Sequence, residues 1–415
     1  MKLKAAVILT GVLAVIVSAD VLGTNDVNAR NNPALGGNPA VIAVNKKVSV
    51  EGGTLLTNAV KQSEQNKDPF GFNSDDIAKG QDLAPSDFGA ATKFLSYTGS
   101  ISNSDWYSIR YNNIGNIFWS VDIKTGDNAP LVPGYGIPDG EKYAFSFVEA
   151  VESVSAVYAK DLGNGFNVGA EVAANTYKRN QTNRAAKKAG ESAGIAFDSQ
   201  LKSDTYLTLA LGAVYDVLPG QKISVSHKFA SARKDNFTNL DGAGKVVQEG
   251  NFNENVPAET ALGYIYQIND ALQAAVSYKA TDGSNYGREI DYDKGTGVPY
   301  ASKNPASEWE NTKTLPNSTW GLAAAYKLNP EIELQGYGTH TKGYRAAWND
   351  VNLTPGDGWN EGFDFTQIGS NVQWTPDFFS GGTLLFGAFN SKIFNATNGY
   401  LLDATTTLVS YSHAF

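Results

Sequence analysis

The amino-acid sequence has no cysteine, and its single methionine is the first residue. Without cysteine, the chain has neither a disulfide framework nor a metal site built on thiolates. Charged residues make up only 18% of the 415 positions, which is a small share for a soluble protein. The formal net charge is -9, so the chain has no basic surplus of the kind that binds nucleic acid.

Long apolar runs are also missing, except at the very beginning. Lys2 and Lys4 precede an apolar stretch at 5–18, which is too short and too early for a membrane-spanning helix. This order, with small residues up to Ala19, is typical of a secretory signal peptide. We therefore expect residues 1–19 to be removed by cleavage near Ala19 and the rest of the chain to be exported.

Aromatic residues and glycine are abundant, at 11% and 42 residues respectively, and many segments alternate in polarity. In 207–215, apolar side chains occupy every second position, with mostly small residues between them, and 320–328 repeats the pattern. Alternation of this kind predicts β-strands with one apolar face. A soluble sandwich would bury that face against a second sheet, whereas a membrane barrel would turn it towards lipid.

The connections between these segments favour the barrel. Short turns rich in Gly, Pro, Asn and Asp alternate along the chain with longer polar connections. Short periplasmic turns and long extracellular loops are typical of outer-membrane barrels. We therefore predict an all-β fold, a 14-stranded antiparallel transmembrane β-barrel over 46–415 with both termini on the periplasmic side. The predicted strands are 46–58, 87–99, 106–123, 142–160, 165–179, 204–217, 222–233, 249–268, 272–282, 317–328, 332–342, 362–374, 382–394 and 400–415.

Both ends of the predicted mature chain carry further information. The last strand ends at Phe415 with apolar residues at alternate positions, which resembles the signal read by the barrel-insertion machinery. The segment 20–45 precedes the first predicted strand and need not span anything. We expect it to form a plug in the lumen of the barrel.

That segment contains Asn38-Pro39-Ala40, which resembles the motif before the first strand of FadL-type outer-membrane transporters for long-chain fatty acids and other hydrophobic compounds. A second copy stands at Asn32-Pro33-Ala34. The resemblance implies a monomer in outer-membrane lipid and lipopolysaccharide. It also implies that a hydrophobic substrate enters a lumenal pocket, movement of the plug releases it, and a kink in the third strand opens the wall sideways.

The third predicted strand contains a candidate for such a kink. Its alternation is interrupted at Asn112, Asn113, Ile114, Gly115 and Asn116. Polar Asn113 and flexible Gly115 fall on the face that should meet lipid. An interrupted ladder would expose backbone groups that only water in an opening can satisfy. The plainer interpretation is a bulge without function, or an extracellular strand end.

Basic residues with lumenal parity are candidates for holding a carboxylate head group. These residues are Arg110, Lys222, Lys228 and Lys279. An arginine guanidinium can clamp a carboxylate through two hydrogen bonds. The alternative is that the cations pair with lumenal acids such as Glu171 and Glu333, because charged side chains are normal inside barrels.

Catalysis has little support in the sequence. The three histidines have no Ser or Cys partner that the pattern singles out, and no metal ligand set or cofactor motif is evident. We therefore expect a protein that is not an enzyme and has no cofactor. The main alternative to hydrophobic transport is a general or sugar-selective diffusion porin, and a further one is an adhesion barrel.

Overall fold

The computed structural model describes most of the barrel wall and a short segment before it. The described residues are 35–60, 87–124, 142–185, 196–241, 244–282, 285–286, 290–294, 312–313, 317–344, 362–395 and 399–415. The predicted signal peptide, the first part of the predicted plug with Asn32-Pro33-Ala34, and most long connections lie outside them. No helix in the described ranges is long and apolar enough to cross a bilayer.

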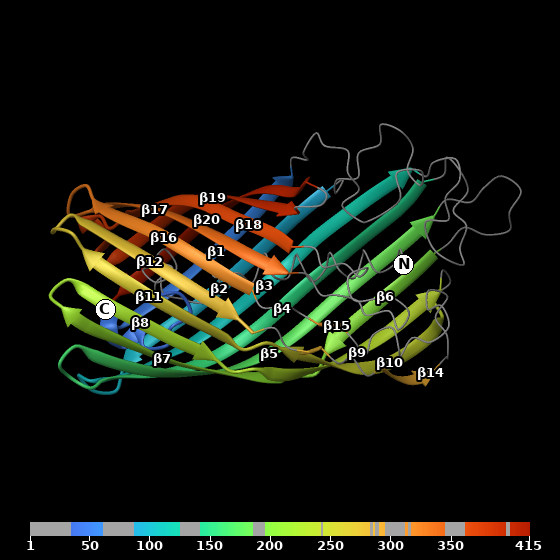
Figure 1. Ribbon diagram of the computed structural model, residues 1–415, viewed down its shortest axis with the longest axis horizontal. Helices are drawn as coiled ribbons and strands as arrows, with labels where there is room; N and C mark the ends of the chain where they lie inside the picture. The colour runs from blue at the N-terminus through green and yellow to red at the C-terminus, as the bar shows by residue number, and fades with distance from the viewer. Residues whose placement is uncertain are drawn as a thin grey trace, which may run out of the picture.

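Eighteen strand segments form one antiparallel sheet that closes on itself (Figure 1). The first five are β1 (Ser49–Val60), β2 (Asp87–Ser100), β3 (Asp105–Lys124), β4 (Lys142–Asp161) and β5 (Phe166–Ala185). The middle of the chain forms β6 (Ala196–Ser203), β7 (Tyr206–Leu218), β8 (Gln221–Lys228), β9 (Ser231–Asp241), β10 (Val246–Val256), β11 (Glu259–Gln267), β12 (Leu272–Thr281) and β14 (Ile290–Lys294). The last five are β16 (Asn317–Lys327), β17 (Ile332–Tyr344), β18 (Gly362–Trp374), β19 (Gly382–Asn395) and β20 (Gly399–Ala414). A separate small pair joins β13 (Asn285–Tyr286) to β15 (Thr312–Lys313).

These segments form a closed barrel of 14 strands, as the alternation predicts. Four of the 14 barrel strands consist of two segments each. The sixth strand is formed by β6 and β7, the seventh by β8 and β9, the eighth by β10 and β11, and the ninth by β12 and β14. Closure is made by β1, which pairs with β2 on one side and with β20 on the other. The backbone N–H of Phe415 donates to the carbonyl of Val48 and completes the seam.

The strand faces alternate between the outside of the barrel and its lumen. On β7 the side chains of Leu207, Leu209 and Leu211 are exposed on the outer face, whereas Val214 is fully buried on the inner one. The same alternation exposes Leu322 on β16. Exposed leucines in this regular array are stable in lipid rather than in water.

One side of the wall is taller than the sequence analysis predicted. The predicted connections 180–203 and 234–248 are partly wrong, because β5 runs to Ala185, β6 begins at Ala196 and β9 runs to Asp241. Figure 1 shows these strands reaching well beyond β16 to β18. They were missed because their outer faces are polar here, so the apolar alternation that identifies a lipid-facing strand is absent.

On this taller side, a belt of polar side chains lies where the outer surface of the wall changes from apolar to polar. We call it the outer polar belt, and its outward-facing members are Lys93, Asn113, Glu152, Lys178, Lys202 and Lys234. At about 3.4 Å per residue and a tilt of about 45°, the stretch of β4 and its turn from Glu152 to Leu162 crosses about 24 Å. This matches the apolar band of about 25 Å in outer-membrane barrels.

The apolar band makes a prediction for Leu211, which lies near its middle. Replacing Leu211 with Arg should lower the free energy of unfolding by about 2–4 kcal/mol, because a charge would face lipid. Gln200→Arg is the matched control, since Gln200 is exposed above the outer polar belt. Denaturant unfolding in lipid vesicles, followed by tryptophan fluorescence, measures both. Equal stability of the two variants would contradict the placement of the membrane.

Candidate functional site in the barrel lumen

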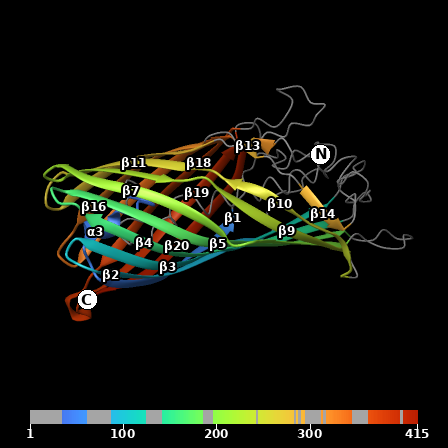
Figure 2. The same ribbon diagram turned by 90° about the horizontal axis from the view of Figure 1, so that it is seen from below.

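The described part of the N-terminal segment, residues 35–45, lies inside the barrel near the end that carries the C-terminus (Figure 2). A turn at Gly37, which has a positive φ of 72°, leads into Asn38. The helix α3 (Val41–Asn45) follows and ends at Lys46, which adopts a left-handed conformation. The helix is too short to be stable alone, so the wall around it must hold it in place.

Asn38 is the main polar anchor of this segment, and only 1% of it is exposed. Its side-chain amide donates to the carbonyls of Ala213 and Val225, both at 3.0 Å, and to Ser224 Oγ at 2.8 Å. Its Oδ1 accepts a hydrogen bond from the backbone N–H of Ala40. Asn38 therefore ties its own turn to both β7 and β8.

Two facing glycines provide the space for this anchor. Gly169 of β5 and Gly212 of β7 are partners in register. A Cβ at Gly169 would lie 2.5 Å from the backbone N of Ala40, and one at Gly212 would collide with Asn38 Oδ1. We call this pair the glycine notch. It lets the Asn38-Pro39-Ala40 backbone lie directly against the wall.

Apolar packing holds the rest of the segment. Leu35, Ala40 and Val41 pack with Val214 and with buried residues of β11 and β12. The opposite face of α3, formed by Ile42 and Ala43, packs against Trp106, Val157 and Ala159. The segment thus contacts both sides of the lumen at the end of the barrel that carries the C-terminus.

An ion pair links the end of α3 to the rim of the barrel at the turn between β4 and β5. Lys46 Nζ lies 2.5 Å from Asp161 Oδ2. Asp161 also accepts a hydrogen bond from the backbone N–H of Gly163 in the turn between β4 and β5. Because Lys46 is about half exposed, this pair contributes at most modestly to stability, and its effect is to fix where the segment leaves the lumen.

A second set of lumenal side chains fills the side of the barrel where the two ends of the sheet meet. Leu55, Phe94, Leu385, Phe389 and Leu408 form one buried cluster with Tyr337 beside it. These residues come from β1, β2, β17, β19 and β20. Their packing narrows the lumen with apolar and aromatic groups rather than with the charged rings of an aqueous pore.

The predicted head-group cations lie inward, but each has an acidic neighbour. Arg110 is 4% exposed, and its Nη1 lies 3.5 Å from Glu171 Oε2. Lys222 forms an ion pair with Asp216 beside the turn between β7 and β8. Lys228 and Lys279 both interact electrostatically with Glu259, which faces Lys228 in register. The structure therefore does not gather the four cations into one anion site.

Arg110 lies directly above the glycine notch. Its partner Glu171 is the next inward-facing residue after Gly169 on β5. The Nε of Arg110 is buried without a hydrogen-bond partner. The Arg110–Glu171 pair thus forms a polar layer between the N-terminal segment and the lumen above it.

The proposed kink in the third strand coincides with two pairing irregularities. The register of β3 against β4 shifts between Gly115 and Ile117, so Asn116 is an extra residue. The ladder between β2 and β3 is interrupted between Gly89 and Lys93. Of the predicted set, Asn112 faces the lumen and Asn113 lies in the outer polar belt, whereas only the backbone of Ile114, Gly115 and Asn116 is described. The irregularity therefore lies at the outer boundary of the apolar band.

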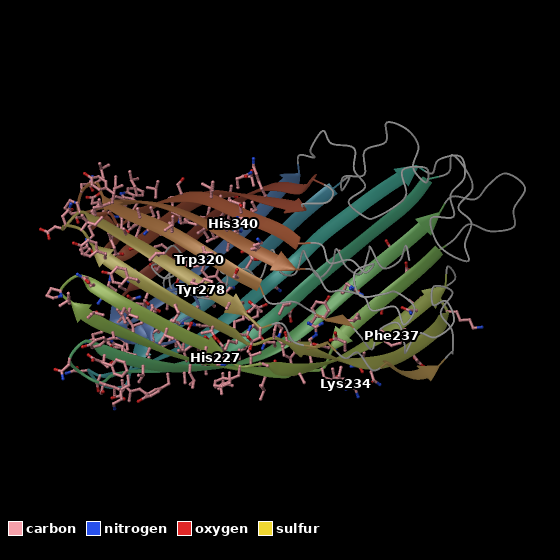
Figure 3. The ribbon with its side chains drawn as sticks, viewed as in Figure 1. His227, Lys234, Phe237, Tyr278, Trp320 and His340 are labelled. Atoms are coloured by element: carbon pink, nitrogen blue, oxygen red, sulfur yellow. The ribbon has the colours of Figure 1, made fainter. Side chains whose placement is uncertain are left out.

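Sequence reasoning missed the partners of the predicted motif. Gly169, Gly212 and Ser224 carry no motif of their own, although a glycine on the lumenal face of an alternating strand often marks a close backbone approach. The described histidines give no catalytic arrangement. His227 and His340 both face outward and bond to the threonines Thr260 and Thr366 (Figure 3).

Comparisons with known proteins identify the fold. No protein-family model and no curated protein sequence matches the chain. The Ralstonia pickettii toluene transporter TbuX is similar in structure, with a TM-score of 0.57 and 14% identity over 93% of this chain and 94% of that chain. The Pseudomonas putida toluene transporter TodX gives 0.55 and 12%, over 91% and 92%. A Pseudomonas aeruginosa FadL homologue gives 0.54 and 13%, over 95% of both chains. This chain therefore has the fold of the FadL-type transporters.

A substitution in the glycine notch should detach the N-terminal segment from the wall and leave the barrel folded. Gly212→Ala should displace Asn38, because the added methyl group would occupy the place of Asn38 Oδ1. Hydrogen exchange of residues 35–45 should then become at least tenfold faster while the strands stay protected. Gly336→Ala is the control, since a Cβ there has open space. Unchanged exchange in Gly212→Ala would contradict the anchoring role of the notch.

Proposed function

We propose that this protein conducts hydrophobic compounds across the bacterial outer membrane, with residues 20–45 as a plug on the periplasmic side. The observation that carries the proposal is the anchoring of Asn38-Pro39-Ala40 in the glycine notch inside a closed barrel. A segment buried on both of its faces blocks the direct route through the lumen. The structural similarity to the toluene transporters TbuX and TodX gives independent support.

The charges in the lumen favour a neutral substrate over a carboxylate. A fatty acid would need an available cation, yet Arg110 is held by Glu171 and almost fully buried. Lys228 and Lys279 share Glu259, and Lys222 is bound to Asp216. Because each of these cations has an acidic neighbour, a carboxylate would have to compete with that acid. A neutral hydrocarbon faces no such competition, so we propose that class of substrate ahead of long-chain fatty acids.

A general or sugar-selective porin is the second candidate. It would need a water-filled lumen lined by polar groups. Two features weigh against it, namely the buried segment at the periplasmic end and the apolar cluster around Phe94 and Phe389. An adhesion barrel would not require either feature. Both alternatives therefore leave the lumenal packing without a role.

For passage through the wall of the barrel we propose a sideways opening beside the third strand. The register shift at Asn116 and the interrupted ladder between β2 and β3 support it. In lipid an unsatisfied backbone group costs several kcal/mol. Such an interruption is tolerable at the level of Asn113, where the outer polar belt admits water.

The life cycle of the protein follows from the same proposal. Residues 1–19 direct export and are cleaved near Ala19, and the strand that ends at Phe415 is read by the barrel-insertion machinery. The barrel then functions as a monomer in contact with outer-membrane lipid and lipopolysaccharide. No cofactor is required, because passage is driven by the gradient of the compound.

Uptake into vesicles that contain the purified protein tests the function. We expect toluene to enter several-fold faster than into empty vesicles, a long-chain fatty acid to enter less efficiently, and sugars not to enter. Arg110→Gln distinguishes the substrates, because a head-group role would weaken fatty-acid uptake alone. Free entry of sugars with no gain for toluene would support the porin instead.

Gly115→Val tests the opening beside the third strand. A β-branched residue at Gly115 should stiffen the irregular segment and lower hydrocarbon uptake several-fold. Gly338→Val on β17 is the control, because Gly338 lies in a regular ladder and a Cβ there would have only ordinary contacts. Unchanged uptake by a well-folded Gly115→Val barrel would rule out this route.

A further inference from the structure

The ladder between the sixth and seventh strands of the barrel is interrupted at one level. The pairing of β6 with β9 ends at Ser203 and Asp235, and that of β7 with β8 begins at Ala210 and Lys228. Both pairings have the same register, so neither strand gains or loses a residue between them. Residues 205–208 and 230–233, which this register would place opposite each other, nevertheless form no ladder, because the described strand pairs do not include β7 with β9.

The cause is a reversal of the strand faces in these crossings. On β7 the exposed outward residues are odd-numbered, as in Leu207, whereas on β6 the exposed residues are even-numbered, as in Lys202. In the sixth strand, the side chains therefore exchange their inward and outward faces at 204–205, where the register against β5 shifts by one residue. In the seventh strand, the same exchange of faces takes place at 229–230, between β8 and β9.

These two reversals are staggered, and the stagger prevents pairing. Over 205–208 of the sixth strand the odd-numbered side chains face outward, whereas over 230–233 of the seventh strand the even-numbered ones do. The common register places Tyr206 opposite Ala232, but Ala232 is exposed on the outside and Tyr206 alternates inward from exposed Leu207. Opposite residues of an antiparallel ladder must point to the same face. The eighth strand, in contrast, reverses at 257–258, directly opposite the seventh, and their pairing resumes in register.

The interruption lies at the outer surface of the membrane. Above it the outward side chains Lys202, Asp204 and Lys234 are polar, and below it Leu207 and Leu209 are apolar. Figure 3 shows Lys234 and His227 on either side of this level. Leu207 is 63% exposed, compared with 41% for Leu209 on the same strand and face. Leu207 therefore has less cover from its neighbours than Leu209 has.

The inner side of the interruption is polar at its edge and apolar above it. Arg233 donates from Nε and Nη2 to Asp235, at 2.8 and 2.7 Å, and its guanidinium lies 4.1 Å from the ring centre of Tyr177. Tyr177 and Leu201 form an inward-facing apolar cluster, with Phe237 packed against it. The charge of Arg233 is neutralised by Asp235, so the inner edge has no net attraction for an anion.

We propose that this interruption, bounded by 205–208 and 230–233, is a lateral entrance through which neutral hydrophobic compounds pass from the outer leaflet into the upper lumen. The inference rests on the proposed transport of such compounds and adds the place where they enter. A compound dissolved in the outer leaflet meets Leu207 and Phe229 at the outer edge. It then passes between the strands towards Tyr177, Leu201 and Phe237. The position at the outer polar belt lets water satisfy the backbone when the entrance is empty.

Lipid quenching tests the entrance without relying on transport. The chain has no cysteine, so a single introduced one can carry a fluorophore. Thr208 faces the lumen, where Asn175 donates to its hydroxyl. In vesicles of lipid brominated near the carbonyl end of the acyl chain, a label on Thr208→Cys should be quenched at least threefold more than one on Ala210→Cys. Ala210 also faces inward, but in the paired ladder. Leu207→Cys is the positive control, and equal, weak quenching at 208 and 210 would overturn the entrance.

Transport through the entrance is tested by closing it. A short bismaleimide between Leu207→Cys and Ala232→Cys should lower toluene uptake several-fold. The same cross-link between Leu211→Cys and His227→Cys, which are partners in the intact ladder, should have no effect. Normal uptake with the first cross-link formed would show that compounds enter elsewhere. If the unmodified protein takes up no toluene, the proposed function fails, and the quenching result still decides whether the wall is open.

Discussion

Satisfaction of backbone hydrogen bonds in lipid is the constraint on which this structure depends. Within the apolar band every strand must pair on both sides, which forces β1 to pair with β20 and closes the wall. The two interruptions of the wall, beside β3 and between β7 and β9, both lie at the outer polar belt. There, water can replace a missing strand partner. The membrane thus determines where the wall can open as well as where it must be closed.

Closure of the wall creates a lumen that must be filled or hydrated. At the end that carries the C-terminus it is filled by residues 35–45, which contact β3, β4, β5, β7 and β8 through Asn38-Pro39-Ala40 and the apolar faces of α3. On the opposite side the cluster around Phe389 fills it. The charged residues between these packed regions are compensated by one another, as in Arg110 and Glu171. A lumen of this composition is suited to compounds that dissolve better in lipid than in water.

The alternation of apolar residues, together with the alternation of short and long connections, was sufficient to predict the number of strands and the direction of their faces within the apolar band. It failed beyond Lys178 and Lys234, where β5, β6 and β9 continue, because outward residues there meet water and no longer need to be apolar. The sequence identified Asn38 as part of a motif, but it did not identify Gly212 and Ser224 as the residues that Asn38 contacts. Their role depends on which strands become neighbours around the lumen, and that is a property of closure. The staggered reversals at 204–205 and 229–230 were hidden for the same reason.

We propose that the segment before the first strand closes the lumen. Conductance across planar bilayers tests it most directly, with the mature chain compared to a variant that lacks residues 20–44. We predict near silence for the mature chain and a steady, larger conductance for the deletion variant, with both barrels folded. A steady conductance of the mature chain that the deletion leaves unchanged would contradict it.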